Sequence, residues 1–174
     1  MTADEFIAWA QDSPEAERHE LIAGMPVAMA PERFAHLRMK ARVVRRLAEA
    51  IEAAGLPCEA FADGLAVAID ESTLYYPDAT LRCGPPPAEG LARIDDPLVI
   101  VEVLSPPTRA VDTGVKLSDY FRLPSLRHYV LLRPETHTII HHARDDDGTI
   151  TTSILREGTL RLDPPGIELA DLFA

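Results

Sequence analysis

Two carboxylates and a lysine in the middle of the chain have the residue types and the order of a site for a hard metal cation. Asp78 follows Pro77 in a short apolar stretch, Glu102 stands inside another, and Lys116 comes after both. Mg²⁺ prefers oxygen ligands, and it needs only one or two carboxylates because it keeps several waters. A cation held by Asp78 and Glu102 can polarise a phosphate and lower the pKa of a bound water. These residues therefore predict metal-assisted hydrolysis.

Glu102 belongs to the run at residues 97–104, whose β-branched side chains predict a buried strand. A carboxylate buried in such a strand is costly unless a partner or a metal ion offsets its charge. Prolines then end the strand, and Thr108 is the N-cap of a predicted helix on which Lys116 and Tyr120 lie one turn apart. Lys116 could orient the attacking water or stabilise negative charge that develops on the phosphate.

Asp78 lies in a predicted strand at residues 75–82, where Pro77 indicates an edge, a strand start or a bulge that exposes the acid. Glu20, in a predicted hairpin at residues 19–29, either joins the acidic cluster or points to solvent, as most glutamates do. His36, near the start of a predicted helix at residues 31–55, is either a surface or core residue or a site residue that titrates near neutral pH. The backbone carbonyl of Val103 could add a third oxygen ligand.

The remaining elements follow from capping, periodicity and turn residues. Thr2 and Glu5 form a capping box at the start of a short amphipathic helix. The apolar positions of the long helix predict a buried stripe of Phe34, Leu37, Val44, Leu47 and Ile51. Further strands are predicted at 58–62 and 65–69, joined as a hairpin by Asp63-Gly64, and at 127–132, 138–142, 149–155, 160–162 and 167–173. Three acids at 145–147 could suggest calcium, but the spacing of an EF-hand is absent and a turn is favoured.

The composition excludes some classes of protein. The chain of 174 residues has a net charge of −11, which disfavours nucleic-acid binding except through a local basic surface. No apolar run approaches the length of about 20 residues that spans a bilayer, and the N-terminal residues lack the pattern of a signal peptide. We therefore expect one cytoplasmic domain, residues 1–174, in which Cys58 and Cys83 are free thiols.

The order of these motifs resembles the PD-(D/E)XK nuclease superfamily and, more narrowly, the bacterial Uma-type family of restriction-endonuclease-like proteins. The resemblance covers residues 6–173 and rests on Tyr76-Pro77-Asp78, on residues 101–106, on the helix with Lys116 and Tyr120, on residues 19–24, on His36 and on residues 124–130. The superfamily lysine stands two residues after the acid, a position that Leu104 occupies here. In the Uma-type family the lysine lies on the following helix, and Lys116 matches it.

The resemblance implies an α/β (α+β mixed) fold, a restriction-endonuclease-like mixed sheet flanked by helices. It implies Glu20, Asp78, Glu102 and Lys116 as catalytic residues, with Asp78 and Glu102 holding Mg²⁺ or Mn²⁺. It also implies that His36, Ser105 and Tyr120 support them. The implied activity is metal-dependent hydrolysis of DNA phosphodiester bonds. The alternative is a non-catalytic protein of the same fold that binds a partner or has a regulatory role, with an idle metal site.

A nuclease with this net charge needs a local basic surface. Arg38, Arg42 and Arg45 follow a four-then-three spacing, which places them on one side of the long helix. They either contact DNA phosphates or form an ordinary solvated face. Cutting both strands of a duplex also favours two sites related by a twofold axis, and we expect a homodimer.

Overall fold

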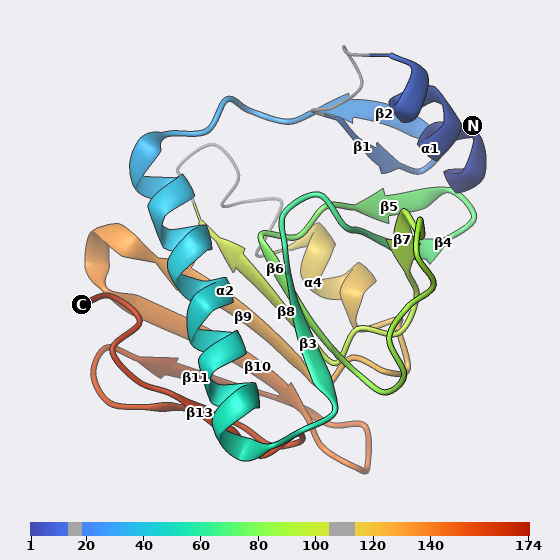
Figure 1. Ribbon diagram of the computed structural model, residues 1–174. Coiled ribbons are helices and arrows are strands. Elements are labelled where there is room, and N and C mark those ends of the chain that lie inside the picture. The colour runs from blue at the N-terminus through green and yellow to red at the C-terminus, as the bar shows by residue number, and fades with distance from the viewer. Residues whose placement is uncertain (14–18, 105–113) are drawn as a thin grey trace.

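The computed structural model describes residues 1–13, 19–104 and 114–174 (Figure 1). The helices are α1 (Ala3–Asp12), α2 (Phe34–Ala54), α4 (Val115–Tyr120) and the 3₁₀ turn η2 (Pro134–Thr136). The strands are β1 (His19–Ile22), β2 (Met25–Ala28), β3 (Cys58–Ala62), β4 (Ala66–Asp70), β5 (Thr73–Tyr75), β6 (Ala79–Cys83), β7 (Arg93–Ile94), β8 (Val99–Val103), β9 (His128–Arg133), β10 (Thr138–Arg144), β11 (Ile150–Leu155), β12 (Leu160–Leu162) and β13 (Ile167–Leu169). The predicted mixed sheet with flanking helices is confirmed.

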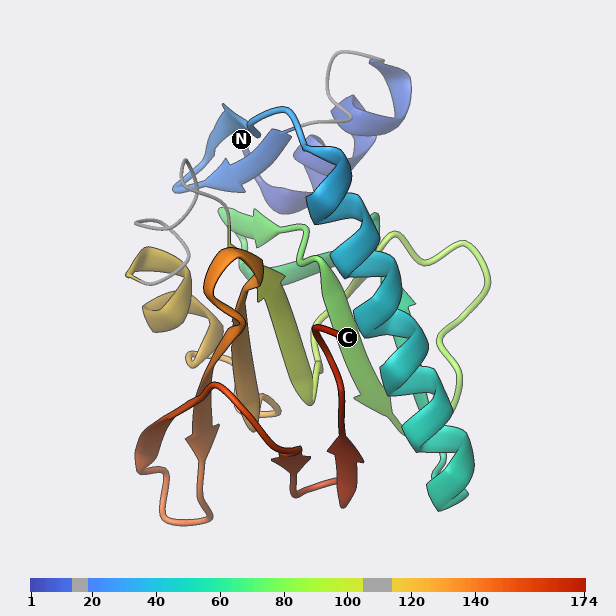
Figure 2. The same ribbon diagram turned by 90° about the vertical axis from the view of Figure 1, so that its left-hand side faces the viewer.

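The central six-stranded sheet has the order β11-β10-β9-β8-β6-β3. Strand β8 pairs with β9 in parallel and with β6 in antiparallel orientation, and all five of its residues are buried. On one face, Val99, Val101 and Val103 pack in a core that includes α2, β12 and β13. On the other face, Ile100 packs in a core that includes α4. Figure 2 shows α2 and α4 on opposite sides of this sheet.

A second sheet of five strands, ordered β2-β1-β5-β4-β7, lies beside the first and carries Glu20. Helix α1 packs against it through Phe6 and Ala3, which share a small core with Leu21, Ala66 and Leu74. The predicted capping box is confirmed, since Glu5 N donates to the Thr2 hydroxyl and Thr2 N donates to the Glu5 carboxylate. The predicted hairpin at residues 19–29 is also confirmed, with its turn at Ala23-Gly24.

Helix α2 begins later than predicted and buries a different stripe. It starts at Phe34, after the N-cap Arg33, and ends at Gly55 as expected. Phe34 and Leu37 were predicted to be buried, but they are exposed. The buried residues are Met39, Lys40, Val43, Leu47 and Ile51. The first turns of α2 extend beyond the hydrophobic core, so the buried stripe begins at Met39, and a lysine lies within it.

Two strand predictions are wrong because long-range pairing overrides local turn signals. Strands β3 and β4 flank Asp63-Gly64, but they belong to different sheets and form no hairpin. The predicted strand at 75–82 is interrupted, since β5 ends at Tyr75 and β6 begins at Ala79. Proline cannot donate to a strand ladder, so Pro77 and Asp78 lie in the connection between the two sheets. The predicted turn at residues 145–148 is confirmed.

The cysteines are joined, which corrects the expectation of free thiols. The register of β3 and β6 places Cys58 directly opposite Cys83, and a disulfide connects them. The prediction relied on compartment and on distance along the chain, and neither shows that two strands will pair here. In the described parts of the chain, no helix is both long enough and apolar enough to cross a membrane.

A chain of neutral histidines lies within the central sheet. His128 Nε2 is 2.8 Å from the carbonyl oxygen of Pro164, which can only accept, so His128 donates there. Its Nδ1 lies 2.9 Å from Nε2 of His141, which must then donate. Burial lowers the pKa of His141 to about 4, and repulsion between its imidazolium form and any proton on His128 or His142 acts in the same direction.

This shift makes stability depend on pH. The unfolded chain binds a proton at His141 near its ordinary pKa of 6.5, while the folded chain does so only near 4. Protons therefore favour unfolding, and up to about 3 kcal/mol of folding free energy is lost as the pH falls through this window. Urea unfolding at several pH values should show a smaller loss in His141→Gln, whose amide can still donate to His128. Parallel pH profiles for the two proteins would contradict this assignment.

Candidate active site

Four of the predicted residues, Glu20, Glu102, Lys116 and Tyr120, form one buried cluster. Lys116 Nζ lies 2.9 Å from Glu20 Oε1 and 3.0 Å from Glu102 Oε1. The hydroxyl of Tyr120 donates to the same Glu102 oxygen at 2.9 Å. All four side chains are buried. Lys116 therefore supplies the positive charge that a carboxylate buried in strand β8 needs. Its ion pairs with Glu102 and Glu20 connect α4 to β8 and β1.

Aromatic residues enclose this ion pair. The ring of Tyr75 lies 5.1 Å from Lys116 Nζ, close enough for a cation–π contact, and its hydroxyl donates to Asp119. Burial and the negative charge of Glu102 raise the pKa of Tyr120, so this hydroxyl stays protonated and can donate. Glu20 also accepts a hydrogen bond from the backbone N–H of Tyr76, two residues before Asp78. Glu20 is thus buried and does not point to solvent.

Asp78 is held at the start of β6 by contacts from two other elements. Its Oδ2 accepts the backbone N–H of Val103 at 2.6 Å, and its Oδ1 lies 2.7 Å from Lys40 Nζ. Nε2 of His36 lies 3.4 Å from Oδ2. Burial by itself raises the pKa of Asp78, but the hydrogen bond from His36 and the charge of Lys40 outweigh it, so the pKa is lowered.

The two carboxylates belong to adjacent strands but are paired from opposite sides of the sheet. Ala79 pairs with Val101 in the antiparallel register, so Asp78 stands at the next position beside Glu102. Asp78 contacts His36 and Lys40 of α2, whereas Glu102 contacts Lys116 and Tyr120 of α4. The Val103 N–H bond ties Asp78 to the residue that follows Glu102.

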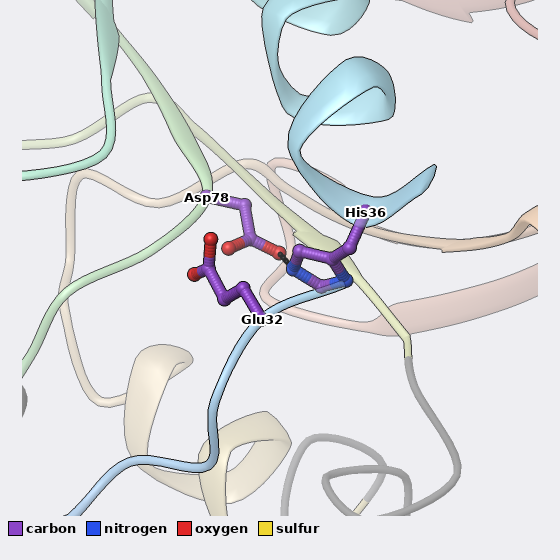
Figure 3. Close-up of side chains that lie close together, drawn as sticks. All are labelled: Glu32, His36 and Asp78. Atoms are coloured by element: carbon purple, nitrogen blue, oxygen red, sulfur yellow. Dashed lines mark ion pairs between the residues drawn. The ribbon is translucent and has the colours of Figure 1, made fainter. Parts of the chain in front are cut away.

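The geometry also defines a group of metal-binding type that the sequence prediction did not include. Ligand atoms of Glu32, His36 and Asp78 all lie within 4.8 Å of one another (Figure 3). Glu32 and Lys40 were not predicted as site residues. The four-residue spacing of His36 and Lys40 places these two on one side of α2 and was a usable signal for Lys40. Glu32 lies before the N-cap Arg33, and helical spacing does not place it.

The remaining predicted residues are placed as follows. Ser105 and Thr108 lie outside the described residues. Arg38 and Arg45 are exposed on α2, and Arg42 is half-buried, with Nη1 3.4 Å from the carbonyl oxygen of Leu172. Lys40 belongs to the same run of basic residues in the sequence, but it is buried and adds nothing to a basic surface.

Solved structures and known sequences resemble this chain over almost its whole length. A crystal structure of a putative nuclease belonging to DUF820, from Anabaena variabilis, matches with a TM-score of 0.76 at 17% identity. The match covers 99% of this chain and 97% of that one, so the fold is that of a nuclease-like protein. An uncharacterized protein of Synechocystis is 27% identical over 172 residues, which are 98% of this chain and 88% of the relative.

A family model matches the sequence over nearly its whole length. The model of the Uma2 family, described as "Putative restriction endonuclease", matches residues 3–171. The protein therefore belongs to the Uma2 family, which confirms the resemblance inferred from its motifs.

The ion pairs around Lys116 should contribute strongly to stability. Lys116→Met would leave Glu20 and Glu102 buried without the charge that neutralises them, at a cost of about 3–5 kcal/mol of unfolding free energy. Lys116→Met combined with Glu102→Gln should recover part of this loss, because one of the two buried charges is gone. Denaturant unfolding measures both variants. A loss below about 1 kcal/mol in the single variant would show that water reaches these carboxylates.

Proposed function

We propose that this protein is a Mg²⁺- or Mn²⁺-dependent endonuclease that hydrolyses DNA phosphodiester bonds. Membership of the Uma2 family supports a nuclease. The observation that carries the proposal is the antiparallel register of β6 and β8, in which Ala79 pairs with Val101. Asp78 and Glu102 are the next positions along, and each is bound to a lysine of a different helix. Glu20, Asp78, Glu102 and Lys116 are the proposed catalytic residues, and His36, Ser105 and Tyr120 their support.

The donor atoms suit such an ion. Asp78 and Glu102 supply buried carboxylate oxygens, which are the ligands that Mg²⁺ and Mn²⁺ prefer. When bound, the ion would polarise the phosphate and lower the pKa of a bound water. Two side chains beside Glu102, those of Tyr120 and Lys116, would act in different ways. Tyr120 and Lys116 hydrogen-bond to Glu102 and fix its orientation. In the proposal the ammonium of Lys116 would hold a water or stabilise charge on the phosphate.

Asp78→Asn tests this assignment directly, because it keeps the shape of the side chain and removes its charge. The parent should convert supercoiled plasmid with Mn²⁺, and the variant should lose about 100-fold or more of this activity. It should also lose the rise in unfolding temperature that Mn²⁺ gives the parent. Arg161→Gln, exposed on β12, is the matched control and should behave like the parent.

The alternative of a non-catalytic protein also has support in the structure. Lysines neutralise both carboxylates, so the cluster could serve as a structural ion-pair network alone. Absence of cleavage and of Mn²⁺ stabilisation in the parent would favour that alternative. We extend the nuclease proposal to a homodimer, since two sites related by a twofold axis suit cleavage of both strands of a duplex. A monomer in light scattering would remove that extension only.

The route for DNA in this proposal is the exposed side of α2. Arg38 and Arg45 are exposed, and Arg38 lies over the ring of Phe34, between His36 and Lys40 in the helix. A basic strip of Arg38, Arg42 and Arg45 along this side of α2 could bind phosphates despite the net charge of −11.

Arg42→Glu combined with Arg45→Glu should weaken DNA binding at low salt and reduce the salt dependence of binding by about two phosphate contacts. The rise in unfolding temperature with Mn²⁺ should stay unchanged, since neither arginine contacts the acidic residues of the site. Arg156→Glu combined with Arg161→Glu changes the net charge equally, from an exposed region of another part of the chain. If the two double variants bind DNA alike, the effect is one of net charge and α2 is not the DNA surface.

A further inference from the structure

Lys40 has the surroundings of a bound metal ion rather than those of an ordinary helix lysine. Its Nζ lies 2.5 Å from Glu32 Oε1, 2.7 Å from Asp63 Oδ2 and 2.7 Å from Asp78 Oδ1. An ammonium group has three N–H donors, and here three carboxylates accept them. The lysine is 5% exposed. These carboxylates come from three separate parts of the chain, so the pocket is built by the fold and not by one helix.

Two of these carboxylates, Glu32 and Asp78, also belong with His36 to a group that has the dimensions of a metal site. The ligand atoms of Glu32, His36 and Asp78 lie within 4.8 Å of one another, as in Figure 3. Ligands about 2.0–2.6 Å from one ion are separated by no more than about 5 Å, so this spacing fits a single cation. A donor set with one imidazole and carboxylates suits Mn²⁺ or Co²⁺ better than Mg²⁺.

We propose that the ammonium of Lys40 is the permanent occupant of a second cation site, where it is bound by Glu32, Asp63 and Asp78. A metal ion in its place would bind through Glu32, His36 and Asp78. This inference rests on the proposed nuclease function, in which Asp78 and Glu102 hold the divalent ion. Lys40 supplies positive charge on the α2 side of Asp78, and the divalent ion supplies it on the side of Glu102. In this proposal the protein uses one metal ion per chain, because the lysine takes the place that a second metal ion would occupy.

Lys40 is accordingly a positioning residue. It engages Oδ1 of Asp78, while the N–H of Val103 and His36 engage Oδ2, so the carboxylate plane is fixed from both ends. A fixed carboxylate presents its oxygens to a metal without reorganisation. Once the lysine charge is removed, the three carboxylates carry three negative charges, and a divalent ion would offset two of them.

The test counts Mn²⁺ ions bound to the full-length chain, by calorimetric titration and by the electron paramagnetic resonance signal of free Mn²⁺. The parent should bind one ion, and Lys40→Gln should bind one more. Lys40→Arg keeps the charge and should stay at the parental number. Adding His36→Ala to Lys40→Gln should remove the gained ion, because the imidazole is one of its ligands.

Each outcome decides the proposal. It is overturned if Lys40→Gln binds no more Mn²⁺ than the parent, or if the parent already binds two ions. A parent that binds no Mn²⁺ would contradict the nuclease proposal, and a gain of one ion in Lys40→Gln would still support the second site. If Lys40→Gln is unfolded without metal, Mn²⁺ should refold it and equal Mg²⁺ should do so less well. A variant that stays unfolded in Mn²⁺ overturns the proposal.

Discussion

The structure depends on the neutralisation of two buried carboxylates at neighbouring positions of the central sheet. Asp78 and Glu102 are 5% and 4% exposed, and a carboxylate that far from water is costly without a counter-charge. Lys40 reaches Asp78 from α2, and Lys116 reaches Glu102 from α4. Lys40 also binds Glu32 and Asp63, and Lys116 also binds Glu20 of the second sheet. Two ion-pair clusters therefore hold the helices on opposite faces, and the Lys116 cluster joins the two sheets.

Much of the fold and part of the site could be predicted from local sequence. The β-branched run around Glu102 identifies the central strand, and the four-residue spacing of Lys116 and Tyr120 predicts that both reach one point. Pairings between distant segments could not be predicted in the same way. Periodicity does not indicate which strand pairs with the strand of Cys58. It also does not show that Lys40 is buried against acidic residues, whereas the neighbouring arginines of α2 reach the surface.

The proposed metal site and the Lys40 cluster share the carboxylate of Asp78. The affinity of the one site therefore depends on the contacts of the other. Asp78 accepts bonds from Lys40, His36 and the N–H of Val103, and Val103 directly follows Glu102. A change on the α2 side is therefore transmitted to the orientation of the carboxylate on which the proposed hydrolysis depends. The same buried ion pairs reduce the repulsion among the acids of the site.

The central claim is that Asp78 and Glu102 share one divalent ion. Crystals of the protein soaked in Mn²⁺ and measured at the manganese absorption edge test it most directly, because the anomalous signal locates the metal without reference to activity. The account predicts one peak within coordination distance of both carboxylates and none at Glu32 and His36. A peak bound by Glu32 and His36 but remote from Glu102, or no peak at Asp78 at all, would contradict it.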